Sequence, residues 1–172
     1  MFIRHNVMTL IYQLPRDSLQ ESNSAMNRAV ILTESLIKIV TAYRQFGNRN
    51  EAGGILLGRM WPGRSVIEIA STPGQGDKSG RYFFERDSLR AQHIIKTVWQ
   101  ESKGEINYFG EWHTHPEPHP CPSLRDRAMM TEMFDGTISH QGALFLLIIG
   151  TCSLWLGQRD ENGLQALERV TT

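Results

Sequence analysis

The sequence is poor in cysteine, has no excess charge of either sign and contains no apolar run long enough to cross a membrane. Lysine plus arginine and aspartate plus glutamate number 18 each, so the chain has no overall field to attract nucleic acid or an anionic membrane. The longest apolar stretch, residues 142–155, is shorter than the roughly 20 residues that a spanning helix needs. We therefore expect neither nucleic acid nor a membrane as a partner.

The two cysteines, Cys121 and Cys152, lie far apart in the sequence. The first 15 residues are apolar over only a few positions and end at Pro15, which does not match the pattern of an export signal. A reducing cytoplasm is therefore the expected location of the protein.

Apolar residues make up 40% of the 172 positions, which is enough to bury a continuous core. No internal repeat and no long linker divides the sequence, so we expect a single domain over residues 1–172. Short apolar runs bounded by turn residues predict strands. These are residues 8–14, 51–59, 65–70, 82–84, 106–115, 143–149 and 153–156.

Apolar residues that recur three or four positions apart predict helices. The expected helices are residues 25–46, 87–100 and 123–134, with a weakly helical tail at 165–170. Residues 16–24 predict a turn or a helix entry, and residues 71–80 predict a loop. Because strands and helices alternate along the chain, we expect an α/β or α+β sandwich.

A candidate metal site begins at the end of the strand predicted at 106–115. His113 and His115 are two positions apart, so a strand directs both imidazoles to one face. Asp126 follows across a loop with proline at every second position, and this loop can return a carboxylate to the histidines. Two nitrogens and one oxygen leave the fourth position of a tetrahedral zinc open to water, which is the pattern of catalytic sites.

Each part of this pattern also has a purely structural interpretation. A pair of histidines in a half-buried strand is common, and the spacing of Ser123 and Asp126 matches the capping box of a helix start. Cys121 lies between the histidines and Asp126, and its thiolate would close the zinc as a structural or self-inhibited site. Zinc-dependent amide hydrolysis further requires a general base and a group that stabilises the oxyanion, for which the candidates are Glu51 and Ser123.

Taken together, the segment NEAGGILLG with Glu51, the sequence HTHP from His113 and the Ser123-x-x-Asp126 spacing resemble the signature of the JAMM (JAB/MPN, Mov34) zinc metallopeptidases. The resemblance covers roughly residues 45–156. It is closest to deconjugating peptidases of antiphage (CBASS) operons, which accompany cGAS-like nucleotidyltransferases, or to their relatives in similar ubiquitin-like operons. It implies a three-layer sandwich in which helices flank a mixed central β-sheet, the JAB/MPN (cytidine-deaminase-like) fold.

The resemblance also implies roles for individual residues. His113, His115 and Asp126 would hold one Zn²⁺ per chain, Glu51 would act as the general base, and Ser123 would hydrogen-bond the oxyanion. Glu111 is a rival acid on the same strand, and we place it behind the ligands or facing solvent because the wider family often has a non-acidic residue there.

The function expected from this resemblance is that of a zinc-dependent isopeptidase or peptidase. Its partner would be a protein substrate with a flexible C-terminal tail, either a ubiquitin-like protein or a conjugated nucleotidyltransferase. Processing of a ubiquitin-fold or sulfur-carrier precursor is the alternative reaction, and a non-catalytic MPN scaffold is the alternative class. Nucleobase deamination requires His-x-Glu and Pro-Cys-x-x-Cys, and the sequence has neither.

Overall fold

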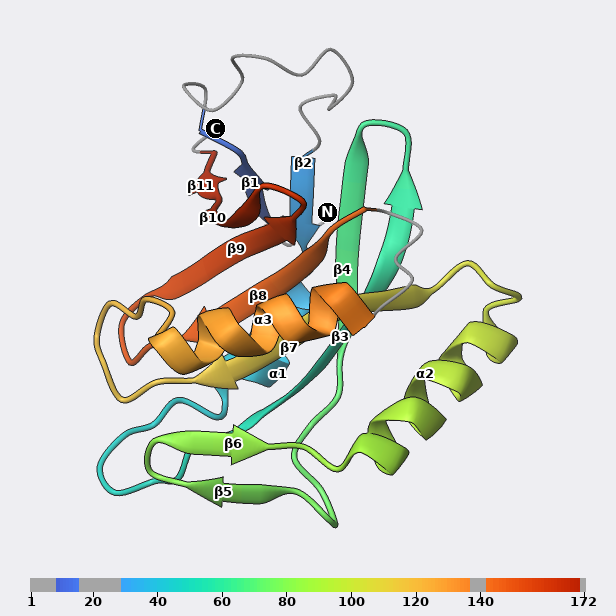
Figure 1. Ribbon diagram of the computed structural model, residues 1–172. Helices are drawn as coiled ribbons and strands as arrows, with labels where there is room; N and C mark the ends of the chain where they lie inside the picture. The colour runs from blue at the N-terminus through green and yellow to red at the C-terminus, as the bar shows by residue number, and fades with distance from the viewer. Residues whose placement is uncertain (1–8, 16–28, 137–141, 171–172) are drawn as a thin grey trace, which may run out of the picture.

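A mixed β-sheet of nine strands organises the computed structural model, which describes residues 9–15, 29–136 and 142–170 (Figure 1). The strand order is β10-β9-β8-β7-β3-β4-β2-β1-β11, and the pairs β2/β4 and β7/β8 are parallel. The strands are β1 (Leu10–Gln13), β2 (Ala29–Leu32), β3 (Gly53–Trp61), β4 (Arg64–Ala70), β7 (Asn107–Thr114), β8 (Leu144–Ile149), β9 (Leu154–Asp160), β10 (Gly163–Ala166) and β11 (Glu168–Arg169).

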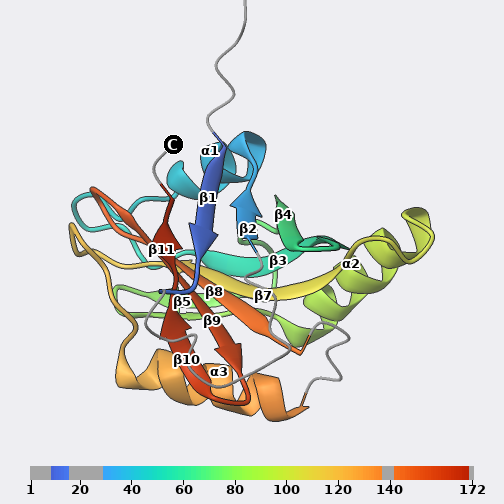
Figure 2. The ribbon, with the colours of Figure 1, turned by 90° about the horizontal axis from the view of Figure 1, so that it is seen from above.

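Helices cover both faces of this sheet. Figure 2 shows α1 (Glu34–Thr41) on one side and α3 (Leu124–Gly136) on the other. The helix α2 (Ser88–Glu101) packs on the same face as α3, against β3 and β7. A separate hairpin of β5 (Lys78–Gly80) and β6 (Phe83–Glu85) precedes α2. The expected three-layer sandwich is therefore confirmed.

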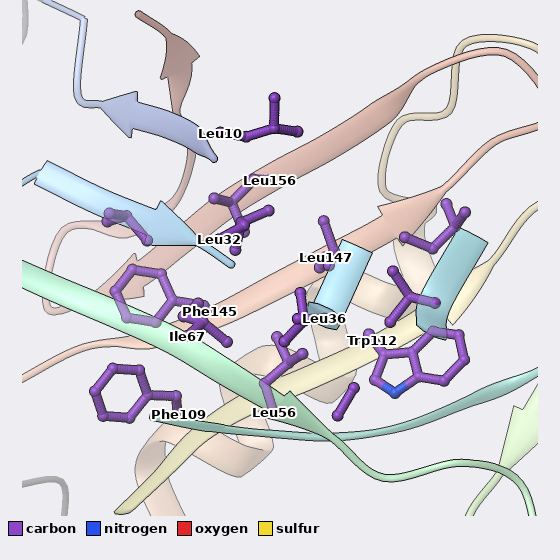
Figure 3. Packing of buried hydrophobic residues seen from close by; sticks show 14 of the residues in the cluster. Leu10, Leu32, Leu36, Leu56, Ile67, Phe109, Trp112, Phe145, Leu147 and Leu156 are labelled. Carbon is purple, nitrogen blue, oxygen red and sulfur yellow. The ribbon is translucent and has the colours of Figure 1, made fainter. Parts of the chain in front are cut away.

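The alternating side chains of β8 show how the two faces are filled. All six of its residues are buried, as expected for a strand covered by helices on both sides. Phe145, Leu147 and Ile149 join the core on the α1 face, while Leu144, Leu146 and Ile148 pack under α3. Figure 3 shows the α1-side cluster, in which Leu36 of the helix meets Leu56 and Leu147 of the sheet.

A one-residue bulge in β7 reverses the facing of its side chains. Leu56 of β3 pairs with Gly110 and Leu57 pairs with Tyr108, so Phe109 is the extra residue. Phe109, at the bulge, belongs to the α1-side core, and three positions later Trp112 occupies the same side. Residues Glu111 and His113 consequently face α3, on the opposite side from Phe109.

The prediction of a helical tail at 165–170 is wrong, because this segment forms β10 and β11. β10 pairs with β9 and β11 pairs with β1, which are the two ends of the rest of the sheet. Between them, the amide of Leu167 donates to the carbonyl of Leu156 on β9. Open strand edges carry unpaired backbone groups, and satisfying them outweighs the weak helical spacing of this tail.

The first predicted helix, residues 25–46, is also partly wrong. Its first four residues lie outside the described ranges, and Ala29–Leu32 forms β2, which pairs with β4. The helix starts only after Thr33, whose hydroxyl accepts a hydrogen bond from the amide of Leu36 at 3.4 Å. The β-branched pair in the Ala29–Leu32 segment favours a strand once a neighbouring strand is available.

The other predicted strands and helices are confirmed, with small changes at their ends. The predicted loop at 71–80 ends in β5, and the predicted turn at 16–24 lies outside the described residues. Cys152 is exposed in the bend before β9. Among the described residues, no helix is long and apolar enough to cross a membrane.

We predict that Gly110→Ala will destabilise the protein by about 3 kcal/mol or more. Gly110 has a φ of 140°, and a Cβ there would overlap the carbonyl oxygen of Phe145 on β8. Gly63→Ala is the matched control, because its φ is 76° and a Cβ there meets no atom within 4 Å; it should cost only about 1 kcal/mol. Urea unfolding of both variants measures the difference, and equal losses would contradict the steric explanation.

Candidate metal centre

The two histidines lie where β7 ends between β3 and β8. His113 and His115 point to the α3 face, and their ring centroids are 4.9 Å apart. His115 follows the last residue of β7, but its amide still donates to the carbonyl of Ile149 at 3.0 Å, which keeps the backbone extended. The strand geometry therefore brings both imidazoles to one point, as the sequence predicted.

The proline-rich loop returns the chain from His115 to the start of α3. It is held against the β8–β9 turn, where the amide of Thr151 donates to the carbonyl of Glu117 and the amides of Cys152 and Ser153 donate to Pro118. These bonds fix the path of a segment that has no helix or strand of its own. Asp126 consequently reaches the histidines from the first turn of α3.

Ser123 and Asp126 form the capping box that was the structural interpretation of their spacing. The Ser123 hydroxyl accepts from the Asp126 amide at 3.2 Å, and Asp126 Oδ2 accepts from the Ser123 amide at 2.7 Å. The Ser123 hydroxyl also donates to Oδ2 at 2.7 Å. Because these contacts use Oδ2, the second oxygen, Oδ1, remains directed at His113, 3.2 Å from its Nε2. Asp126 can therefore take part in the cap of α3 and still present an oxygen to His113.

The separations between donor atoms fit a tetrahedral zinc ion. The two Nε2 atoms are 3.1 Å apart. Oδ1 of Asp126 lies 3.2 Å from Nε2 of His113, and Oδ2 of the same carboxylate lies 3.4 Å from Nε2 of His115. Ligand bonds of 2.0–2.1 Å at tetrahedral angles place neighbouring donor atoms about 3.3 Å apart. The three side chains that the sequence proposes as ligands thus lie close to this spacing, with Asp126 presenting a different oxygen to each histidine.

Glu51 lies beside this group and offers a second possible donor set. Its carboxylate and the two histidines have donor atoms within 4.8 Å of one another. Glu51 Oε1 is 4.0 Å from Nε2 of His113, which is farther than the oxygens of Asp126. The shorter contacts favour Asp126 as the ligand and leave Glu51 at a distance suited to a water molecule between it and the ion.

Burial and neighbouring charges shift the pKa values of Glu51, Asp126 and His115 in different directions. Burial raises the pKa of Glu51, although the two histidines oppose the shift. Burial also tends to raise the pKa of Asp126. Hydrogen bonds with His113 and His115 outweigh the effect of burial and hold this pKa well below the usual range. Burial lowers the pKa of His115, yet the contact with Asp126 prevails and raises it. Asp126 is therefore an anion, and Glu51 is a stronger base than an exposed glutamate.

Glu111 is buried rather than solvent-facing, which corrects one of the two expected placements. Its carboxylate accepts hydrogen bonds from Nε of Arg86 at 2.9 and 3.1 Å and from the hydroxyl of Tyr108 at 2.7 Å. Burial nevertheless raises its pKa, with Arg86 opposing the shift. Because its oxygens are already engaged by two partners, Glu111 is less available than Glu51 to accept a proton from water.

Two adjoining cavities open at the candidate centre. One of about 190 Å³ contains Glu51, His113, His115, Ser123 and Asp126. The other, of about 420 Å³, extends past Glu111 and Arg86 under α3. The two cavities share four lining residues, which are Phe84, His113, Arg125 and Met129. The pair provides space for an extended segment to pass the centre between β6 and α3.

This combination of a mixed sheet with a histidine pair at the end of β7 and an aspartate on the next helix defines the class of JAB domains. Residues 33–168 match the family model described as prokaryotic homologs of the JAB domain, and the chain belongs to that family.

Two proteins similar to this chain are named CD-NTase/cGAS isopeptidase. The first, from Escherichia coli (strain TW11681), is 33% identical over 83% of this chain and 89% of its own length. The second, from Vibrio cholerae, is 29% identical over 82% of this chain and 88% of its own length. The solution structure of a Desulfitobacterium hafniense protein has a TM-score of 0.55 and 20% identity, covering 78% of this chain and 87% of that one, which is a likeness of fold.

Sequence reasoning missed several residues around the centre. Gln45 and Thr114 are buried beside it and hydrogen-bonded to each other, and Arg86 partners Glu111. The alternation of a strand predicts that Thr114 faces away from the histidines, but no sequence signal identifies Gln45 or Arg86. Cys121 is exposed, and the group formed by Glu51, His113 and His115 does not include it.

We predict that apparent zinc affinity will fall by at least about tenfold when the pH is lowered from about 8 to 6. Zinc binds neutral imidazole, and Asp126 raises the pKa of His115, so protons begin to compete at a higher pH than at an ordinary histidine. Competition with a chromophoric chelator measures the affinity. His119→Ala is the control, since His119 contacts Ser153 instead. An affinity independent of pH would refute the involvement of His115.

Proposed function

We propose that this protein is a zinc-dependent isopeptidase that releases a target from a protein conjugated through its C-terminal tail. The observation that carries the proposal is the convergence of His113, His115 and Asp126 at zinc-ligand spacing with Glu51 beside them. The names of the relatives support a conjugated nucleotidyltransferase as the substrate.

In the proposed mechanism, His113, His115 and Asp126 would hold one zinc ion per chain. A bound zinc ion would supply water of lowered pKa and a Lewis acid for the scissile carbonyl. Glu51 takes the proton from the attacking water and delivers it to the leaving amine. Its raised pKa suits both steps, because a base works best when its pKa approaches the working pH.

Ser123 has the proposed role of stabilising the oxyanion. Its hydroxyl lines the smaller cavity and donates to Asp126 Oδ2 at 2.7 Å. To stabilise an oxyanion the hydroxyl must rotate towards the substrate, and the backbone amide of Ser123 then keeps the hydrogen bond to Oδ2. The capping box consequently survives while the hydroxyl changes partner.

The size of the cavities supports a flexible tail as the substrate segment. A volume of about 190 Å³ at the centre admits a few main-chain atoms and small side chains, but no folded domain. An extended chain with small residues at the scissile bond fits this space. Processing of a ubiquitin-fold or sulfur-carrier precursor uses the same chemistry and remains the alternative reaction.

We place this activity in the cytoplasm, within an antiphage system of the CBASS type. The presence of both cysteines as free thiols supports a reducing compartment. The nucleotidyltransferase named in the relatives supports the link to antiphage defence. A scaffold role has less support, because this chain retains every proposed ligand and the proposed base.

Replacing Glu51 by Gln should lower kcat at least about 100-fold, because the amide cannot accept the proton. Zinc should remain bound, since Glu51 lies farther from the histidines than Asp126 does. Cleavage assays together with measured zinc content test both statements. Glu111→Gln is the matched comparison and should retain most of the activity. Full activity of the Glu51 variant would transfer the base role to Glu111.

A panel of fusion proteins with different C-terminal tails tests the substrate class. We expect the wild-type protein to cut after the tail of a CD-NTase-like nucleotidyltransferase attached to a target lysine, and His113→Ala to be inactive. Preferential cleavage of a linear precursor would favour the processing alternative. An intact wild-type protein that binds zinc and cleaves no member of the panel would refute the deconjugating function.

A further inference from the structure

The segment that carries Glu51 has no regular secondary structure of its own. Residues 42–52 connect α1 to β3, and Glu51 lies in the last part of this connection, residues 49–52. A general base must nevertheless stay within a fraction of an ångström of its working position, because small displacements cost large factors in rate. Contacts with neighbouring segments must therefore hold Glu51 in place.

Direct hydrogen bonds tie this segment to its neighbours. The amide of Glu51 donates to the carbonyl of Gly80 in β5 at 2.8 Å. Ala52 is bound twice by Thr114, whose amide donates to the Ala52 carbonyl at 2.8 Å and whose hydroxyl accepts from the Ala52 amide at 3.0 Å. Thr114 is the residue between the two histidines, on the opposite face of the strand.

Gln45 joins these contacts into one network. Its amide nitrogen donates to the carbonyls of Arg49 at 3.2 Å and Arg81 at 3.0 Å, while its oxygen accepts from the hydroxyl of Thr114 at 3.0 Å. Both N–H groups and the carbonyl of the side chain are thus used. Gln45 is 2% exposed and Thr114 is fully buried, so water cannot replace these bonds.

We propose that Gln45 is a positioning residue, which fixes Glu51 relative to the histidine pair by linking its segment, the β5–β6 hairpin and Thr114. The inference rests on the proposed role of Glu51 as the base. Gln45 touches neither the candidate ligands nor the two cavities at the centre, so its effect on the reaction passes through Glu51.

The test replaces Gln45 by Met, which has a similar volume but none of the three hydrogen bonds. We expect kcat to fall roughly 10- to 100-fold at unchanged KM and unchanged zinc content. Amide hydrogen exchange at Glu51 and Ala52 should accelerate in the zinc-free protein as well. This second measurement reports the loss of the network independently of activity.

Asn107→Leu is the matched control. The Asn107 side-chain amide also donates to two carbonyls, those of Gly104 at 3.1 Å and Glu105 at 3.3 Å, but it lies at the other end of β7. This variant should lose stability without losing kcat. If it lowers kcat as much as Gln45→Met does, the role of Gln45 is merely structural and the proposal is overturned.

Thr114→Val provides a second variant that removes only a hydroxyl from the network. We expect a similar fall in kcat, and a double variant with Gln45→Met should be little worse than either single one, because both break the same chain of bonds. If Gln45→Met does not fold, full activity of zinc-loaded Thr114→Val overturns the proposal. Multiplicative losses in the double variant overturn it as well.

The failure of this inference can be distinguished from failure of the proposed function. A zinc-loaded wild-type protein that cleaves no fusion refutes the function and, with it, the positioning role. A wild-type protein that cleaves, accompanied by an equally active Gln45→Met variant, refutes only the positioning role.

Discussion

The bulge at Phe109 in β7 is the constraint on which the candidate centre depends. In a regular strand, Phe109, Glu111 and His113 would face the same side of the sheet, because they are two positions apart. With it, Phe109 enters the core on the α1 face while the histidines face α3. Gly110 makes the bulge possible, because its φ of 140° and its contact with the backbone of Phe145 exclude a side chain.

Beyond the bulge, the two faces of β7 have different surroundings. The side that carries His113 and His115 forms the wall of the cavities, and the side that carries Trp112 and Thr114 is buried against the region of α1. Polar groups on the buried side must be paired, because water cannot reach them. Thr114 meets this requirement by bonding Gln45 and Ala52, and the same bonds hold the segment that carries Glu51.

The start of α3 also combines stability with the chemistry of the centre. Asp126 caps the helix through Oδ2 and presents Oδ1 to His113. A carboxylate at a helix N-terminus is stabilised by the free amides there, and the adjacent histidines add to this effect. The anion that helps α3 to begin is therefore the one that a zinc ion would use, so loss of Asp126 affects the helix and the centre together.

The sequence by itself determined the layered fold, most strands and helices, and the five residues proposed to act at the centre. Strand periodicity placed His113 and His115 together, and the signature resemblance selected Glu51, which lies 62 positions before His113. The separations between His113, His115 and Asp126, like the proximity of Glu51, became evident only in the folded chain, because they join segments distant in sequence.

Only the tertiary structure decided the strands of the C-terminal tail, the start of α1, the burial of Glu111 and the position of Gln45. Each depends on a partner outside its own segment. The tail requires two open strand edges, β2 requires β4, Glu111 requires Arg86, and Gln45 requires three chain segments at once. Local periodicity contains no information about such partners, since hydrogen bonds and ion pairs between distant segments form only when the whole sheet has assembled.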